Sequence, residues 1–138
     1  RSWAFDYGQP FTRQTEEQLL QLMAPSYIDG LTLLGGEPFE PENQRALLPF
    51  VQRVKQCYPQ KTVWAYSGFV LEQLQTPGHY ANCEATQALL ALVDVLVDGR
   101  FVAAEKDISL RFRGSKNQRL IDMNRTREAG HVVLWDDK

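Results

Sequence analysis

The chain has 138 residues, 43% of them hydrophobic and 23% charged, values typical of one soluble globular domain that buries its core without disulfides. The formal net charge of -2 gives no electrostatic reason to expect nucleic acid or an anionic membrane as partner. No apolar run approaches the roughly 20 residues that cross a bilayer, and the N-terminal residues lack the apolar core of a signal peptide.

The two cysteines, Cys57 and Cys83, are too few for a disulfide scaffold, and their separation fits no zinc motif. The two histidines, His79 and His131, have no neighbouring partners, so the sequence supports neither a zinc site nor a catalytic triad. Reduced thiols favour a cytoplasmic protein. Because residue 1 is an arginine, we expect the chain to begin inside a longer gene product, as a single domain over residues 1–138 that is incomplete at its N-terminus.

Short apolar runs, typical of buried strands, alternate along the chain with stretches in which apolar residues recur every three or four positions, typical of helices. The longest helical stretch contains Pro49, which we expect to kink it. The alternation predicts an α/β fold with a mostly parallel sheet and right-handed crossovers. The predicted elements in chain order are helix 15–23, strand 31–34, helix 41–58, strand 62–66, helix 70–75, helix 82–92 capped by Asn82, strand 93–97 and strand 132–135.

Three of the predicted strands stop at a conspicuous dipeptide. The carboxyl ends of parallel strands lie along one edge of a sheet, and ligands bind at that edge in such folds. We therefore expect the three dipeptides to converge on one site, although each alone is more often a simple turn. They are Gly35-Gly36, Ser67-Gly68 and Asp98-Gly99.

The first of these dipeptides continues into Glu37 and Pro38. Two glycines permit positive φ and close approach of a ligand to the backbone, and a carboxylate beside exposed carbonyls suits an ammonium group. The alternative is a tight turn between strand and helix with Glu37 in solvent. The motif alone does not separate the two interpretations.

A basic stretch near the C-terminus contains a single acidic residue, Asp122. Such a stretch either binds phosphate or the acidic surface of a partner, or forms a solvated face, and charge runs are more often the latter. Its cationic residues are Arg111, Arg113, Lys116, Arg119, Arg125 and Arg127.

With these motifs in hand, the chain resembles the anaerobic ribonucleoside-triphosphate reductase activating proteins, which belong to the radical S-adenosylmethionine superfamily. The resemblance covers nearly the whole chain in the family's order, and the Gly-Gly-Glu-Pro and Arg-Gly-Ser-x-Asn-Gln motifs together make it specific. The segments that carry it are Trp3, Gly8–Thr12, Leu34–Pro38, Trp64–Gly68, Asp94–Phe101, Arg113–Gln118 and Val132–Trp135.

The resemblance implies a partial (β/α) barrel of the radical S-adenosylmethionine type and an oxidoreductase activity. A 4Fe–4S cluster would reduce S-adenosylmethionine, and the resulting radical would take a hydrogen from a glycine of the reductase large subunit. By resemblance, Gly35, Gly36 and Glu37 would receive the methionine ammonium group. Ser67 would lie near the ligand's carboxylate or ribose. Asp98 and Arg100 occupy the place of an Asp-x-Lys pair, in which Arg100 would pair with the carboxylate.

The family's Cys-x3-Cys-x2-Cys motif is absent from this sequence. We therefore expect the family's N-terminal strand and cluster loop to be missing, the cluster ligands to lie upstream, and this truncated chain to be inactive. No catalytic or metal-binding residue is assigned within it. The implied partners are the reductase large subunit and an electron donor such as a flavodoxin-like reductant.

Two alternatives remain open at the level of sequence. The first is a non-catalytic nucleotide-binding or partner-docking module that keeps the fold without the cluster. The second is a general α/β phosphate-binding protein that uses the basic stretch.

Overall fold

The computed structural model describes residues 2–6, 18, 20, 21, 24, 30–34, 37–100, 104 and 117–135. In this part of the chain, five strands form one sheet in the spatial order β1-β2-β3-β4-β5. The first four strands are parallel, and β5 is antiparallel to β4. This confirms the predicted α/β class and mostly parallel sheet. The strands are β1 (Ser2–Asp6), β2 (Gly30–Leu34), β3 (Thr62–Tyr66), β4 (Val95–Asp98) and β5 (Arg119–Asp122).

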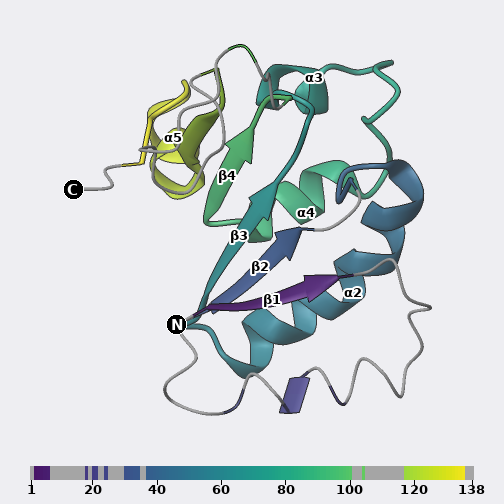
Figure 1. Cartoon of the computed structure of the whole chain (residues 1–138), viewed down its shortest axis with the longest axis vertical. Coiled ribbons are helices and arrows are strands. Elements are labelled where there is room, and N and C mark those ends of the chain that lie inside the picture. Colours follow the sequence, from purple (N-terminus) through teal and green to yellow (C-terminus); the bar gives the residue numbers. More distant parts are fainter. Residues whose placement is uncertain are drawn as a thin grey trace.

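Helices connect and cover the strands. α2 and α4 pack against each other over one face of the sheet, and α5 lies at the β5 edge (Figure 1). The carboxyl ends of the parallel strands point toward the end of the molecule that carries α3 (Figure 1). The helices are α2 (Pro41–Cys57), α3 (Leu71–Gln75), α4 (Thr86–Leu92) and α5 (Met123–Ala129).

The sequence of α2 explains both its start and its orientation. Pro41 occupies the first turn, where a missing N–H costs nothing, and Glu42 lies near the positive end of the helix dipole. Pro49 does not end the helix, which continues to Cys57. The buried face follows helical spacing and packs into the core through Leu47, Phe50, Val51 and Val54.

The sheet requires glycine at one position. A Cβ on Gly30 would lie 2.2 Å from the backbone oxygen of Thr62 on the neighbouring strand, so any larger residue would force β2 and β3 apart. On the far side of β3, all four residues of β4 are buried, as expected for a central strand of a parallel sheet.

The predicted elements agree with the structure in the middle of the chain and differ toward both ends. The strand at 62–66 is confirmed with the same bounds, and the strand predicted at 93–97 begins two positions later, at Val95. The helix expected from Asn82 begins at Thr86, because the Asn82 side chain donates instead to the carbonyl of Leu74 at 2.7 Å.

At the C-terminal end, the predicted strand 132–135 is reduced to an isolated antiparallel bridge between Leu134 and Ile121. The sequence analysis did not predict β1, β5 or α5. Of the predicted helix at 15–23, residues 18, 20 and 21 are helical and the others lie outside the described residues. No helix in the described part of the chain has the length and apolar character needed to cross a membrane.

Candidate functional site at the carboxyl edge of the sheet

The carboxyl ends of β2, β3 and β4 lie along one edge of the sheet, as the sequence predicts. Glu37 follows β2, Ser67 follows β3, and Asp98 is the last residue of β4. Gly35 and Gly36 lie outside the described residues. The structure therefore brings together four of the six predicted binding residues at this edge, Arg100 being the fourth.

The Glu37 carboxylate is held against the end of the neighbouring strand. Its Oε2 accepts hydrogen bonds from the Ser67 hydroxyl and the Phe39 N–H, both at 2.9 Å. Its Oε1 accepts from the Gly68 N–H at 2.7 Å. The side chain is half-buried, so it does not lie free in solvent as the simple-turn interpretation expected.

This arrangement leaves acceptor capacity on Glu37. A carboxylate has about four lone-pair positions, and Oε1 receives one hydrogen bond here where Oε2 receives two. The Glu37 backbone is fixed as well, because Asn43 of α2 donates to its carbonyl at 2.8 Å. A fixed, negatively charged group with an available lone pair is suited to bind a cationic donor.

Ser67 connects the ends of three strands. It is buried, and its N–H donates to the carbonyl of Val97 in β4 at 2.9 Å. Its hydroxyl donates to Glu37 and accepts from the Phe69 N–H at 3.0 Å. The segment after β3 is therefore attached to the residue that follows β2 and to the end of β4.

Asp98 is directed into the protein. It is 0% exposed, and Arg119 of β5 binds both of its oxygens, from Nε to Oδ1 at 2.9 Å and from Nη2 to Oδ2 at 2.5 Å. The same Oδ2 accepts from the Leu71 N–H at 2.7 Å. The carboxylate predicted to face a ligand is thus engaged inside the chain.

Arg119 has a second carboxylate partner in Glu72 of α3, at 2.7 Å from Nη2 to Oε1. Asp98 first, and then Glu72, raise the pKa of Arg119. The hydrogen bond from Arg119 lowers the pKa of Glu72. Three charged groups from β4, β5 and α3 therefore form one network at the site edge.

Arg100 is exposed and follows Gly99, whose φ of +103° suits glycine. Two amides bind the backbone of this turn: Gln118 Nε2 donates to the Gly99 carbonyl at 3.1 Å, and Asn117 Nδ2 donates to the Arg100 carbonyl at 2.7 Å. The Asn-Gln pair of the second family motif thus fixes the turn of the first.

The three described arginines of the basic stretch all have partners within the chain. Arg119 binds Asp98 and Glu72, Arg125 lies 3.7 Å from Asp122, and Arg127 donates to the carbonyl of Leu90 at 3.1 Å. Arg111, Arg113 and Lys116 lie outside the described residues. Arg119 in particular is a structural cation, which the expectation of a solvated or docking face had not separated from the others.

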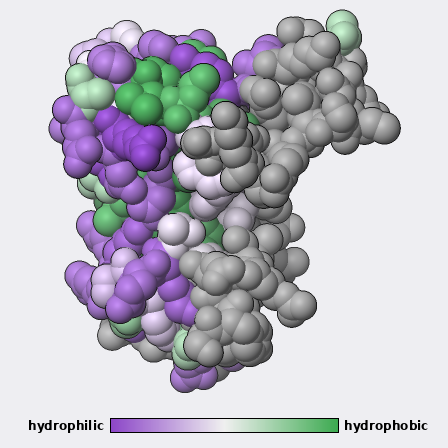
Figure 2. Space-filling view, turned by 90° about the vertical axis from the view of Figure 1, so that its left-hand side faces the viewer, coloured by the Kyte–Doolittle hydropathy of each residue, from purple (hydrophilic) through white to green (hydrophobic). Residues whose placement is uncertain are grey.

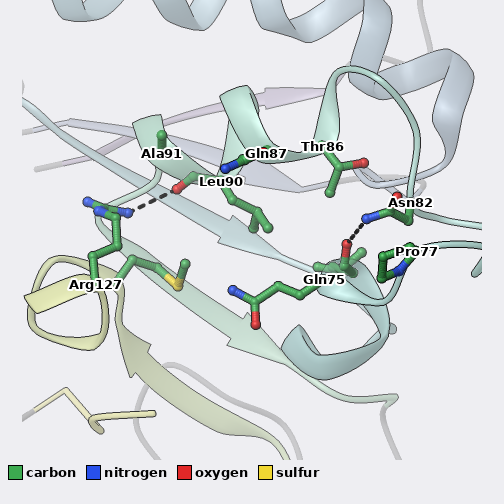
Figure 3. Close-up of a pocket in the computed structure, with 10 residues that line it drawn as sticks. Gln75, Pro77, Asn82, Thr86, Gln87, Leu90, Ala91 and Arg127 are labelled. Carbon is green, nitrogen blue, oxygen red and sulfur yellow. Dashed lines mark hydrogen bonds between the residues drawn. The ribbon is translucent and has the colours of Figure 1, made fainter. Parts of the chain in front are cut away.

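Two further surface features lie near α3 and α4. Hydrophobic residues gather at the α3 end of the face shown in Figure 2, where Phe69 and Val70 are half-buried. A pocket of about 510 Å³ lies between α3, α4 and α5, away from the predicted binding residues (Figure 3). Its lining residues are Leu74, Gln75, Pro77, Asn82, Thr86, Gln87, Leu90, Ala91, Met123 and Arg127.

The described residues do not fit an iron–sulfur cluster. Among them, no group of three or more His, Cys, Asp or Glu side chains is arranged to hold a metal ion. Cys57 is exposed at the end of α2, whereas Cys83 is half-buried, with its Sγ 3.5 Å from Gln44 Oε1. A 4Fe–4S cluster takes several closely spaced thiolates, and these two cysteines do not supply them.

Comparison with known proteins adds what the geometry leaves open. Residues 1–121 match the family model described as a 4Fe–4S single cluster domain. The anaerobic ribonucleoside-triphosphate reductase-activating protein of Haemophilus influenzae is 40% identical over 120 residues, which is 86% of this chain and 72% of the relative. The proteins of the same name from Pasteurella multocida and Escherichia coli K12 are 41% and 37% identical, covering 86% and 85% of this chain and 72% of each relative. No solved structure matches significantly.

The chain is thus a member of the 4Fe–4S single-cluster class. Within that class, it belongs to the family of anaerobic ribonucleoside-triphosphate reductase-activating proteins.

Proposed function

We propose that this protein is a radical-generating activating enzyme of anaerobic ribonucleoside-triphosphate reductase, and that it binds S-adenosylmethionine at the carboxyl edge of its sheet within a partial (β/α) barrel. Family membership supports the activity, because the relatives are named for activating that reductase. The observation that supports the binding site is the contact of Glu37 with Ser67 and Gly68 across two strand ends.

The methionine end of S-adenosylmethionine carries an ammonium group and a carboxylate. The remaining acceptor capacity of Glu37 suits the ammonium group, together with the backbone of Gly35 and Gly36. The exposed guanidinium of Arg100 suits the carboxylate. Ser67 is proposed to act beside the ligand mainly by orienting Glu37, because its hydroxyl donates to that carboxylate.

The iron–sulfur cluster of this family supplies an electron to the bound sulfonium compound. The residues present here do not fit such a cluster, so we propose that its ligands are not among them and that this chain's part is to bind and orient S-adenosylmethionine. The non-catalytic alternative is less favoured, because the relatives that cover most of the chain are named activating proteins.

Calorimetric titration of the full chain with S-adenosylmethionine tests the site. Glu37→Ala removes a charge-assisted acceptor, so we expect the dissociation constant to rise by about tenfold or more. Glu37→Gln should have an intermediate effect, because it keeps an acceptor oxygen without the charge. Glu42→Gln is the control: it removes an exposed charge from the first turn of α2. Equal affinities in all four proteins would remove Glu37 from the binding site.

A further inference from the structure

The charged network beside the site contains a residue whose role the family motifs do not give. We propose that Arg119 is a positioning residue: by binding Asp98, it fixes residues 67–71 so that Ser67 and Gly68 meet Glu37. The effect on residues 67–71 stands on the contacts alone. Its consequence for S-adenosylmethionine rests on the proposed function.

The first step runs from Arg119 to the start of α3. Arg119 holds both oxygens of Asp98, which orients that carboxylate, and Oδ2 of Asp98 accepts the Leu71 N–H at 2.7 Å. α3 spans only Leu71–Gln75, and a helix this short has little stability of its own. Its position therefore depends on contacts such as this hydrogen bond.

The second step runs from α3 back to Glu37. The segment between β3 and α3 is bound to the end of β4 by two backbone hydrogen bonds, Ser67 N–H to Val97 O at 2.9 Å and Gly99 N–H to Phe69 O at 3.2 Å. On its other side, the Gly68 N–H donates to Glu37 at 2.7 Å. A shift of α3 therefore changes the contact that orients Glu37.

Asp98 makes the arrangement dependent on Arg119. Asp98 is 0% exposed, whereas the Arg119 side chain is 32% exposed and supplies the counter-charge from the rim. Losing one partner of a buried ion pair leaves an uncompensated charge and destabilises strongly, whereas replacing both partners is often tolerated. Single and paired substitutions therefore separate a loss of charge balance from a loss of positioning.

Glu72 reinforces the same link. It binds Arg119 from α3 itself, with Nη2 to Oε1 at 2.7 Å and Nη1 to Oε2 at 3.3 Å, and its side chain is 61% exposed. An exposed ion pair is weak, so we expect Glu72 to contribute less than Asp98.

The test compares amide hydrogen exchange in the full chain for the parent, Arg119→Lys and the double variant Asp98→Asn/Arg119→Gln. The decisive readout is the Gly68 amide, which Arg119 does not contact. Charge-assisted bonds are about twice as strong as neutral ones, so we expect the Gly68 and Leu71 amides to exchange about tenfold faster in both variants. Arg45→Lys is the matched control, because Arg45 makes a comparable two-bond contact to an exposed carboxylate, that of Glu84.

The second readout is the affinity for S-adenosylmethionine, measured beside urea unfolding. If Arg119 positions the site, the double variant recovers the stability that Arg119→Lys loses, yet its dissociation constant stays about fivefold or more above that of the parent. If Arg119 is merely structural, affinity and stability recover together. That result would overturn its role in the site.

The two readouts keep the proposals apart. Parental exchange rates at Gly68 and Leu71 in both variants would overturn the positioning of residues 67–71, whatever the ligand does. A parent chain that shows no affinity for S-adenosylmethionine would count against the proposed function, while the exchange rates would still decide the role of Arg119.

Discussion

The hydroxyl of Ser67 donates to Oε2 of Glu37 at 2.9 Å, across 30 positions of sequence and between the ends of neighbouring parallel strands. Ser67→Ala removes this donor and also leaves the Phe69 N–H without its acceptor. We expect a loss of about 1–3 kcal/mol in the free energy of unfolding, measured with urea.

A suitable control for this substitution is Thr76→Ala. The Thr76 hydroxyl donates only to the carbonyl of Glu72, in an exposed turn at the end of α3. We expect it to cost clearly less than Ser67→Ala. Equal costs would show that the contact between Ser67 and Glu37 contributes no more than an ordinary surface hydrogen bond.

The buried amide of Gln44 joins α2 to α4 and to the loop before it. It is 0% exposed, donates to the carbonyls of Phe39 and Ala81 at 2.7 Å each, and accepts from the Thr86 hydroxyl at 2.6 Å. Gln44→Leu keeps a similar volume but leaves these groups unpaired, so we expect a loss of about 2–4 kcal/mol in unfolding free energy.

Gln52→Leu is the control for Gln44, because Gln52 is an exposed residue of the same helix. Its effect on urea unfolding should stay within about 0.5 kcal/mol of zero. If Gln44→Leu is equally mild, the buried hydrogen bonds do not hold α2 and α4 together.

Glu72 predicts a specific dependence of stability on pH. The hydrogen bond from Arg119 lowers its pKa below the usual 4.5, so the folded state favours the charged form. The stabilisation is present above the unfolded pKa and is lost as pH falls through the lower, folded value. Glu72→Gln should therefore lose less stability than the parent between about pH 5 and about pH 3. Parallel losses in urea unfolding across that range would contradict the ion pair.

The two cysteines predict that the 138-residue chain does not assemble the family's cluster. Incubated without oxygen with ferrous iron and sulfide, it should retain no stable 4Fe–4S absorption, and Cys57→Ser/Cys83→Ser should behave like the parent. About four irons per chain, lost in the double variant, would mean that these cysteines do take part in a cluster.

The central strands and the convergence of their ends were predictable because their signals are local. Residues 62–66 form a short apolar run that stops at Ser67-Gly68, and parallel pairing places such ends at one edge. The partner of Asp98 was not predictable in this way. Arg119 lies 21 positions later in the chain, and in the sequence it looks like one more member of a basic stretch.

The missed elements depend on pairing with distant segments. β1 has the sequence SWAFD, which has no clear period, and it is defined by its register with Gly30–Leu34. α5 did carry a usable signal: Asp122 caps its start by accepting from the Arg125 N–H at 3.0 Å, and Gly130 ends it with φ +76°. Reading residues 111–127 only for charge hid both signs.

The most direct measurement of the central claim is a titration of the full, isotope-labelled chain with S-adenosylmethionine, followed by the backbone amide resonances. Binding at the carboxyl edge should shift the amides of Ser67, Gly68 and Gly99 in a saturable way, while that of Gln56, near the far end of α2, stays in place. No saturable shift, or shifts confined to Gln87 and Ala91 in the separate pocket, would contradict the assignment of the site.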